Sequence, residues 1–206
     1  MTMEMGQPSV ARLAGQRLSA RSLEVPAFHL GGRLTLPSRD RLRAAGASIT
    51  DVIVLAAGIA LGQAPQVNVT LAAGELVPRP GLRVGWLVRE GDALVPLSLP
   101  YQPEETAAAL RERRRQALVR YRETRALRAD CAVMVSNLGP QRVEWFTALP
   151  FPGVTVMLAV GTGREAAGGG QEVAVTLTCD HRIIDGYDAA QYFSSLSRGC
   201  QHVTSF

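Results

Sequence analysis

The residues best suited to chemistry lie in the segment Cys-Asp-His-Arg-Ile-Ile-Asp-Gly, which ends at Gly186. His181 and Asp185 are four residues apart, and Arg182 follows the histidine directly. An imidazole titrates near neutral pH and can take a proton from a thiol or a hydroxyl. A neighbouring carboxylate and arginine can hold the loop and select the imidazole tautomer. The segment therefore predicts a general base, although the same spacing also suits a structural histidine at the end of a strand.

A strand and a helix flank this segment and should position it. Residues Glu172 to Cys179 alternate, with three valine or leucine side chains and Cys179 on one face and alanine and threonines on the other. A glycine at 186 permits a sharp turn, and Tyr187 to Leu196 then reads as a helix. We therefore expect His181 at the end of a buried strand.

The rest of the chain mixes strands and helices without strict alternation. Helices are expected over residues 9–22, Ser38 to Gly46, Ser48 to Leu61 and Pro103 to about Leu127. Ser48 and Asp51 have the spacing of a capping box, and acids follow Pro103 in the first turn. Further strands are expected at Phe28–Leu36, Val67–Leu71, Leu82–Val88, Ala93–Leu99, Cys131–Leu138, Val143–Leu149 and Val154–Val160, with a glycine-rich hairpin connection over Gly161–Gly170. This order predicts one α/β domain over residues 1–206, a two-layer sandwich of a mixed β-sheet covered by helices.

Composition narrows the classes of protein that the chain can be. A hydrophobic content of 47% is that of a folded domain. No apolar run is long enough to span a bilayer, and no signal peptide is visible. Three widely spaced cysteines suggest reduced thiols, so we expect a cytoplasmic protein. The chain has no lysine, so it cannot carry lipoate, biotin or pyridoxal phosphate on its own side chains.

Several elements together resemble the catalytic domain of dihydrolipoamide acyltransferases, the core components of 2-oxo acid dehydrogenase complexes. Residues 180–186 match the family signature Asp-His-Arg-x-x-Asp-Gly, and Ser136-Asn137-Leu138-Gly139 matches its Ser/Thr-Asn-x-Gly element. Residues 151–161, and the strands near 67–69, 84–88 and 94–97, follow in family order. The resemblance covers about Ser9 to Leu196 and implies the fold of chloramphenicol acetyltransferase.

The resemblance also implies roles for the site residues. His181 would be the general base, and Ser136 would donate a hydrogen bond to the oxyanion of the tetrahedral intermediate. Asp185 and Arg182 would hold the loop, with Asn137 and Gly186 in support. In this family the serine and histidine come from different subunits, so we expect a homotrimer or a larger trimer-based assembly. The alternative for Ser136 is a strand-end serine that caps a turn.

Three functions remain open. The chain begins almost at the catalytic domain, so we first expect a stand-alone enzyme without lipoyl or subunit-binding domains. Such an enzyme would move an acyl group, taken to be acetyl, from a thioester donor to a small-molecule hydroxyl in specialised metabolite biosynthesis. The donor would be coenzyme A or an acyl-carrier or lipoyl thioester, with no covalently bound cofactor. The alternatives are the core acyltransferase of a 2-oxo acid dehydrogenase complex, acting on dihydrolipoamide, and a non-catalytic assembly protein.

Other features carry weaker signals. Arginines from Arg111 to Arg128 form either a contact for coenzyme A phosphates or an acidic carrier protein, or a solvated helix face, and we favour the solvated face. No recognition motif accompanies the charge, so we expect no nucleic-acid partner. His29, His202 and the cysteines have no metal-ligand spacing, so no metal site is expected.

Overall fold

The structure is a computed structural model that describes residues 23–126 and 130–203. The helix expected over residues 9–22 lies outside the described residues. Within the described ranges, no helix has the length and apolarity needed to cross a bilayer. The cytoplasmic location stays a prediction.

A six-stranded mixed sheet forms the first layer, in the order β1-β8-β7-β6-β4-β5. β6 pairs in parallel with β4 and β7, and the other neighbours are antiparallel. The strands are β1 (Ala27–Leu36), β4 (Arg83–Glu90), β5 (Ala93–Pro100), β6 (Val133–Asn137), β7 (Val156–Glu165) and β8 (Gln171–Asp180). A separate hairpin pairs β2 (Val69–Ala72) with β3 (Glu75–Pro78).

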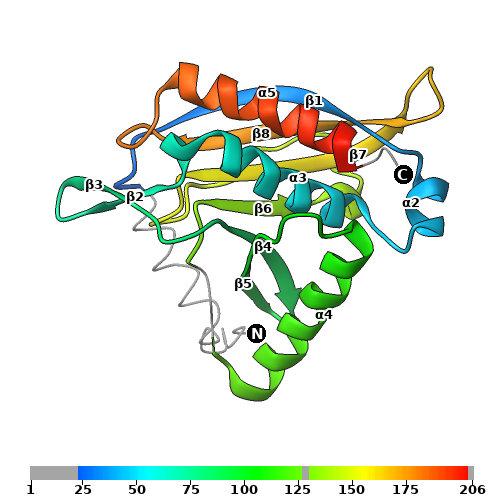
Figure 1. The fold of residues 1–206 in the computed structure, drawn as a ribbon, viewed down its shortest axis with the longest axis horizontal. Coiled ribbons are helices and arrows are strands. Elements are labelled where there is room, and N and C mark those ends of the chain that lie inside the picture. Colours follow the sequence, from blue (N-terminus) through cyan, green and yellow to red (C-terminus); the bar gives the residue numbers. More distant parts are fainter. Residues whose placement is uncertain (1–22, 127–129, 204–206) are drawn as a thin grey trace, which may run out of the picture.

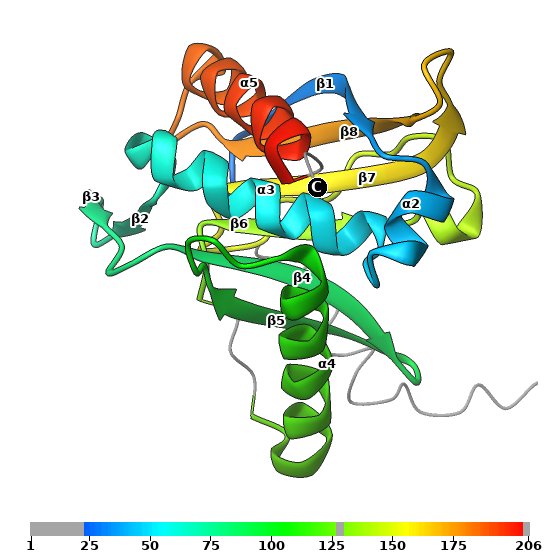
Figure 2. The ribbon, with the colours of Figure 1, turned by 45° about the vertical axis from the view of Figure 1, so that its right-hand side comes forward.

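Helices cover one face of this sheet, as the sequence predicts (Figure 1). α3 (Ile49–Gln63) and α5 (Gly186–Val203) lie side by side on that face, and α2 (Arg39–Ala44) precedes α3. α4 (Ala107–Thr124) contacts α3 and β5 and projects away from the layer formed by α3 and α5 (Figure 2). Two short 3₁₀ turns, η1 (Pro65–Val67) and η2 (Gly139–Gln141), complete the elements.

Local chemistry explains where the helices begin. Ser48 caps α3, and Asp51 completes the predicted capping box. The start predicted at Pro103 for the long helix is wrong. Thr106 is the N-cap of α4 and accepts from the Ala109 N–H, because Glu104 adopts φ +62° and so interrupts the helix before it.

The main core lies between the sheet and the pair α3 and α5. α3 is buried on nearly all sides, and Leu158 and Leu177 from the central strands are fully buried beneath it. Each such side chain contributes about 1.5–3 kcal/mol through burial. The helices approach closely at Gly199, where an added Cβ would lie 3.0 Å from the Ala56 carbonyl oxygen. Small residues thus let the helix layer pack as one unit.

The opposite face of the sheet carries a second, smaller apolar cluster. Met134 and Met157 lie on it, and the segment 142–154 crosses over it. Thr178 Oγ1 donates a 2.8 Å hydrogen bond to the Ala148 carbonyl and also contacts His29 Nδ1 at 2.9 Å. This segment is therefore pinned across the sheet rather than paired with it.

Two strand predictions need correction. The strand expected over Val143–Leu149 is wrong, because this segment has no ladder partner and crosses the sheet, leaving Trp145 68% exposed. β7 continues beyond Val160 through a β-bulge to Glu165, so the first part of the expected glycine-rich loop is strand. An added Cβ on Gly161 would lie 1.9 Å from the Glu144 carbonyl oxygen, so the crossing segment needs glycine there.

Candidate active site

His181 lies at the end of β8, where the predicted buried strand leaves the sheet. Its backbone N–H donates a 2.8 Å hydrogen bond to the Pro26 carbonyl, which extends the β1–β8 pairing beyond Asp180. The side chain is exposed, and its ring makes an edge contact with Phe28 at a centroid distance of 4.9 Å. No hydrogen bond from another described residue reaches the imidazole.

Asp180 and Arg182 hold the loop around the histidine. The Asp180 carboxylate is 3% exposed and accepts from Arg182 Nε at 2.9 Å, Nη2 at 2.7 Å and the backbone N–H at 3.0 Å. The hydrogen bond to Asp180 raises the pKa of Arg182. Asp180 belongs to the family signature, but the sequence alone predicts no role for it. Its burial is the tertiary signal that identifies it as the anchor of this turn.

Asp185 caps α5 instead of contacting the imidazole. Its Oδ1 accepts from the N–H groups of Tyr187 at 2.8 Å and Asp188 at 3.0 Å. A carboxylate at an N-cap commonly accepts such hydrogen bonds from the first N–H groups of the helix. Gly186 begins the helix without a positive φ, so the turn into α5 does not use a backbone conformation reserved for glycine. The predicted role of Asp185 in holding the loop of the active site stays a prediction.

Ser136 and Asn137 end β6, as the motif predicts. Ser136 alternates with Val135, which belongs to the main core, and so lies on the face of Met134. No described residue hydrogen bonds to its hydroxyl. Asn137 Nδ2 donates to Thr50 Oγ1 at 2.9 Å, and its Oδ1 accepts from the Gly139 N–H at 2.8 Å. Asn137 therefore ties the end of β6 to the first turn of α3.

The structure does not bring Ser136 and His181 together within one chain. Ser136 pairs with Ala159, and Ala159 pairs with Thr176, which lies five residues before His181. At about 3.3 Å per residue and 4.8 Å per strand, the two Cα atoms are about 19 Å apart. The two side chains also lie on opposite faces of the sheet. Phe28, which contacts His181, packs against the main core on the helix side, whereas Ser136 lies on the face of Met134. A base and an oxyanion donor must both lie within hydrogen-bond reach of the reacting group.

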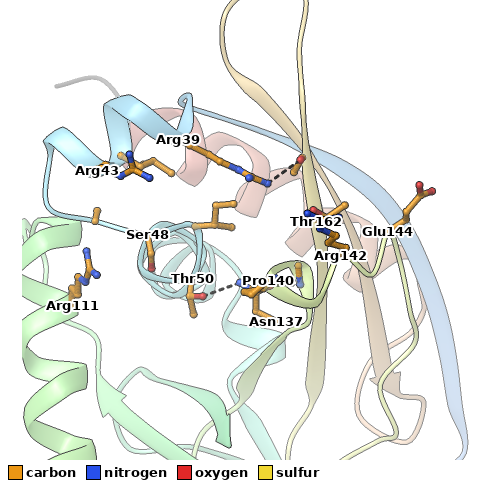
Figure 3. Close-up of a pocket in the computed structure, with 15 residues that line it drawn as sticks. Arg39, Arg43, Ser48, Thr50, Arg111, Asn137, Pro140, Arg142, Glu144 and Thr162 are labelled. Atoms are coloured by element: carbon orange, nitrogen blue, oxygen red, sulfur yellow. Dashed lines mark hydrogen bonds between the residues drawn. The ribbon is translucent and has the colours of Figure 1, made fainter.

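An arginine-lined cavity of about 730 Å³ opens beside Asn137 (Figure 3). Its arginines are Arg39, Arg43, Arg111 and Arg142, contributed by α2, α4 and the turn after β6. The single carboxylate on its wall, Glu144, is paired with Arg164. Four guanidinium groups around one cavity favour an anionic ligand with several negative charges.

Sequence reasoning missed most of this cavity. The sequence places Arg111 within a charged helix, and Arg39, Arg43 and Arg142 belong to no motif. These side chains converge because α2, α4 and the turn after β6 meet at the first turn of α3. Within the described residues, no group of histidine, cysteine, aspartate or glutamate side chains could hold a metal ion.

The strand order and the single layer of helices define a domain with the chloramphenicol acetyltransferase fold. A chloramphenicol acetyltransferase structure superimposes with a TM-score of 0.61 at 14% identity, covering 90% of this chain and 94% of that one. Residues 33–205 match the family model of the 2-oxoacid dehydrogenases acyltransferase (catalytic domain), and the chain belongs to this family. The predicted fold, family and enzyme class, an acyltransferase domain, are confirmed.

Two relatives sharpen the comparison. The chain is 24% identical to the dihydrolipoyllysine-residue acetyltransferase component of the pyruvate dehydrogenase complex of Zymomonas mobilis, covering 91% of this chain but only 47% of that protein. A structure of Azotobacter vinelandii dihydrolipoamide acetyltransferase superimposes with a TM-score of 0.81 at 19% identity, covering 99% and 92% of the two chains. That work investigated the roles of a serine, a histidine and an asparagine in the catalytic mechanism, the last two four residues apart.

These comparisons reorder the functions left open by the sequence. They support the dihydrolipoamide alternative better than acyl transfer to a small-molecule hydroxyl in specialised metabolism. The chain spans less than half the length of the Zymomonas relative. The stand-alone organisation therefore stays a prediction.

Proposed function

We propose that this domain transfers an acyl group between coenzyme A and a dihydrolipoyl group, with His181 as base and Ser136 as oxyanion donor. The observation that carries the proposal is the matched family domain, in which the His181 imidazole is exposed at the histidine motif and Ser136 lies at the serine motif. Within the part of the chain that the structure describes, no hydrogen bond occupies either side chain. The dihydrolipoyl group must be attached elsewhere, because these 206 residues contain no lysine.

The proposed reaction follows from these two groups. The imidazole of His181 takes the proton from the attacking thiol, and the thiolate adds to the thioester carbonyl carbon. The Ser136 hydroxyl donates to the resulting oxyanion, which typically lowers the barrier by about 3 kcal/mol. The intermediate then collapses, the donor sulfur leaves as a thiolate, and the imidazolium returns the proton to it. His181 therefore takes up one proton and gives up one proton in each turnover.

The active site is proposed to lie between two chains. Ser136 and His181 of one chain are too far apart to serve one carbonyl, and a neighbouring copy can supply the missing group. A ring of three chains would repeat the same contact three times and close. This supports the predicted homotrimer.

The arginine-lined cavity is proposed to receive the phosphates of coenzyme A. It lies next to Asn137, one residue after the oxyanion donor, so a bound donor could extend its thioester toward Ser136. Exchanging Arg142 for Gln should raise the KM for acetyl-coenzyme A about tenfold and leave the KM for dihydrolipoamide unchanged. Arg120→Gln, on the exposed side of α4 and outside the cavity, is the matched control.

The direct test is acetyl transfer from acetyl-coenzyme A to free dihydrolipoamide. His181→Ala should lower kcat by about 10²- to 10⁴-fold with the assembly intact by light scattering. His202→Ala, an exposed histidine in the last turn of α5, should retain normal activity. A wild-type protein that acylates hydroxyl compounds but not dihydrolipoamide would favour the small-molecule reading. Full activity of His181→Ala would remove the proposal.

A further inference from the structure

The ring of Phe28, which belongs to no motif, contacts the imidazole of His181. Phe28 is half-buried on β1 and pairs with Cys179 across the β1–β8 ladder. His181 lies two residues beyond Cys179, so Phe28 and His181 are diagonal neighbours on the same face. Their rings meet at 4.9 Å between centroids with an interplanar angle of 61°. The contact is an edge-to-face pair, the preferred geometry of aromatic rings.

Within residues 23–126 and 130–203, the other contacts of His181 hold its backbone and its loop and not its imidazole. The backbone of His181 is fixed by its hydrogen bond to Pro26, and the loop is held by Asp180 and Arg182. Neither contact restrains the χ angles of the histidine side chain. No other described residue donates to or accepts from the ring. Among the described residues, the Phe28 ring makes the one aromatic contact to the imidazole, and its edge limits where the imidazole can point.

We propose that Phe28 is a positioning residue, which holds the His181 imidazole in the rotamer that faces the attacking thiol. This inference rests on the proposed function, in which His181 is the base. A base acts only from a narrow range of distances and angles, so unused rotamers reduce the productive fraction of active sites. Phe28 touches no reacting atom in this role. Phe28 sets the fraction of substrate-bound active sites in which the His181 imidazole faces the attacking thiol.

The fold supplies a matched control at Phe193. Phe193 lies on α5, is also half-buried, and packs against the same strand, where its ring fills the space beside Gly32. Both phenylalanines pack against the main core, but only Phe28 contacts the His181 ring. Gly32 lies four residues after Phe28, about 13 Å along an extended strand. Phe193→Leu therefore reproduces the packing loss without the imidazole contact.

The test compares Phe28→Leu, Phe28→Tyr and Phe193→Leu in acetyl transfer from acetyl-coenzyme A to dihydrolipoamide. Leucine keeps an apolar side chain but removes the ring, so Phe28→Leu should lower kcat between about twofold and tenfold with both KM values unchanged. Phe28→Tyr keeps the ring and should retain most of kcat. Phe193→Leu should lower the thermal midpoint as much as Phe28→Leu does and leave kcat near wild type.

The outcomes separate this inference from the proposed function. If His181→Ala abolishes turnover but Phe28→Leu and Phe193→Leu have equal kcat, the positioning role is wrong and the base assignment stands. If His181→Ala remains active, the proposed function itself fails. Should Phe28→Leu not assemble, Phe28→Ile carries the same comparison, since a β-branched side chain suits a strand.

Discussion

Ser136 and His181 lie on opposite faces and at opposite ends of the sheet, about 19 Å apart by strand register. If each active site combines the serine of one chain with the histidine of its neighbour, two inactive variants should complement each other. We expect Ser136→Ala and His181→Ala chains, co-expressed with different tags and purified through both, to recover activity. Each mixed trimer has one boundary with both intact groups, so about one third of wild-type kcat should return.

The complementation experiment can also contradict a site shared between two chains. Each variant alone should show at most about one hundredth of wild-type activity. If mixed trimers verified by mass spectrometry are no more active than either parent, the two residues do not share a site across a boundary.

Asn137 and Thr50 join the end of β6 to the first turn of α3. Asn137→Ala removes two hydrogen bonds and should lower the free energy of unfolding by about 2 kcal/mol. Thr50→Val removes only the acceptor and should cost about 1 kcal/mol. Urea denaturation measures both values. Thr124→Val, at an exposed position in the last turn of α4, should change stability by less than about 0.5 kcal/mol. Equal effects at Thr50 and Thr124 would contradict the proposed link.

A buried ion pair fastens α4 to the cap of α3. Arg114 bonds the nearly buried carboxylate of Asp51, and its guanidinium lies 4.9 Å over the Trp86 ring. Burial lowers the pKa of Arg114, with the Asp51 charge opposing this shift. Asp51→Asn leaves the guanidinium buried without a counter-charge and should cost about 3–5 kcal/mol. Calorimetry should show this loss as a lower thermal midpoint.

The exposed pair of Asp40 and Arg43 is the matched comparison. Asp40→Asn breaks a 4.0 Å contact between two largely exposed side chains and should cost less than about 0.5 kcal/mol. Adding Arg114→Met to Asp51→Asn should restore part of the loss, because no charge then remains buried. A double variant no more stable than Asp51→Asn alone would show that the ion pair is not the cause.

The three buried cysteines should make the free energy of unfolding decrease as the pH rises into the alkaline range. Burial raises the pKa of each thiol, Cys131, Cys179 and Cys200, from 9.0 to about 12. The unfolded chain therefore loses these protons at a lower pH than the folded chain, and folding stability falls as pH rises above 9. Each thiol contributes a decrease of about 1.4 kcal/mol per pH unit in this window. Urea denaturation at pH 8 and pH 10 should reveal the difference.

A variant with all three cysteines changed to alanine is the control for this pH effect. It starts less stable, but its stability should fall much less between pH 8 and pH 10 than that of the wild type. An unchanged slope would assign the alkaline loss to other groups. Native thiols should also react with a disulfide reagent at pH 8 only as fast as the protein opens, because thiolate is the reactive form.

Local patterns predicted much of the scaffold. The alternation of β8, the capping box of α3 and the apolar run along that helix depend on neighbours within one element, so they can be read from the chain. The histidine and serine motifs likewise predict His181 and Ser136 as site residues, and their catalytic roles stay predictions. The strand predicted over residues 143–149 is wrong, because the alternation there comes from a segment that crosses the sheet and not from a paired strand.

The sequence by itself determined that His181 ends a buried strand, that Ser136 ends another, and that lipoate cannot be attached to these residues. Only the tertiary structure decided that the two lie far apart, that Phe28 meets the imidazole, and that four arginines surround one cavity. The physical reason is that strand order and helix packing join residues distant in the chain. Those contacts depend on the burial of whole faces, which no short pattern of residues specifies.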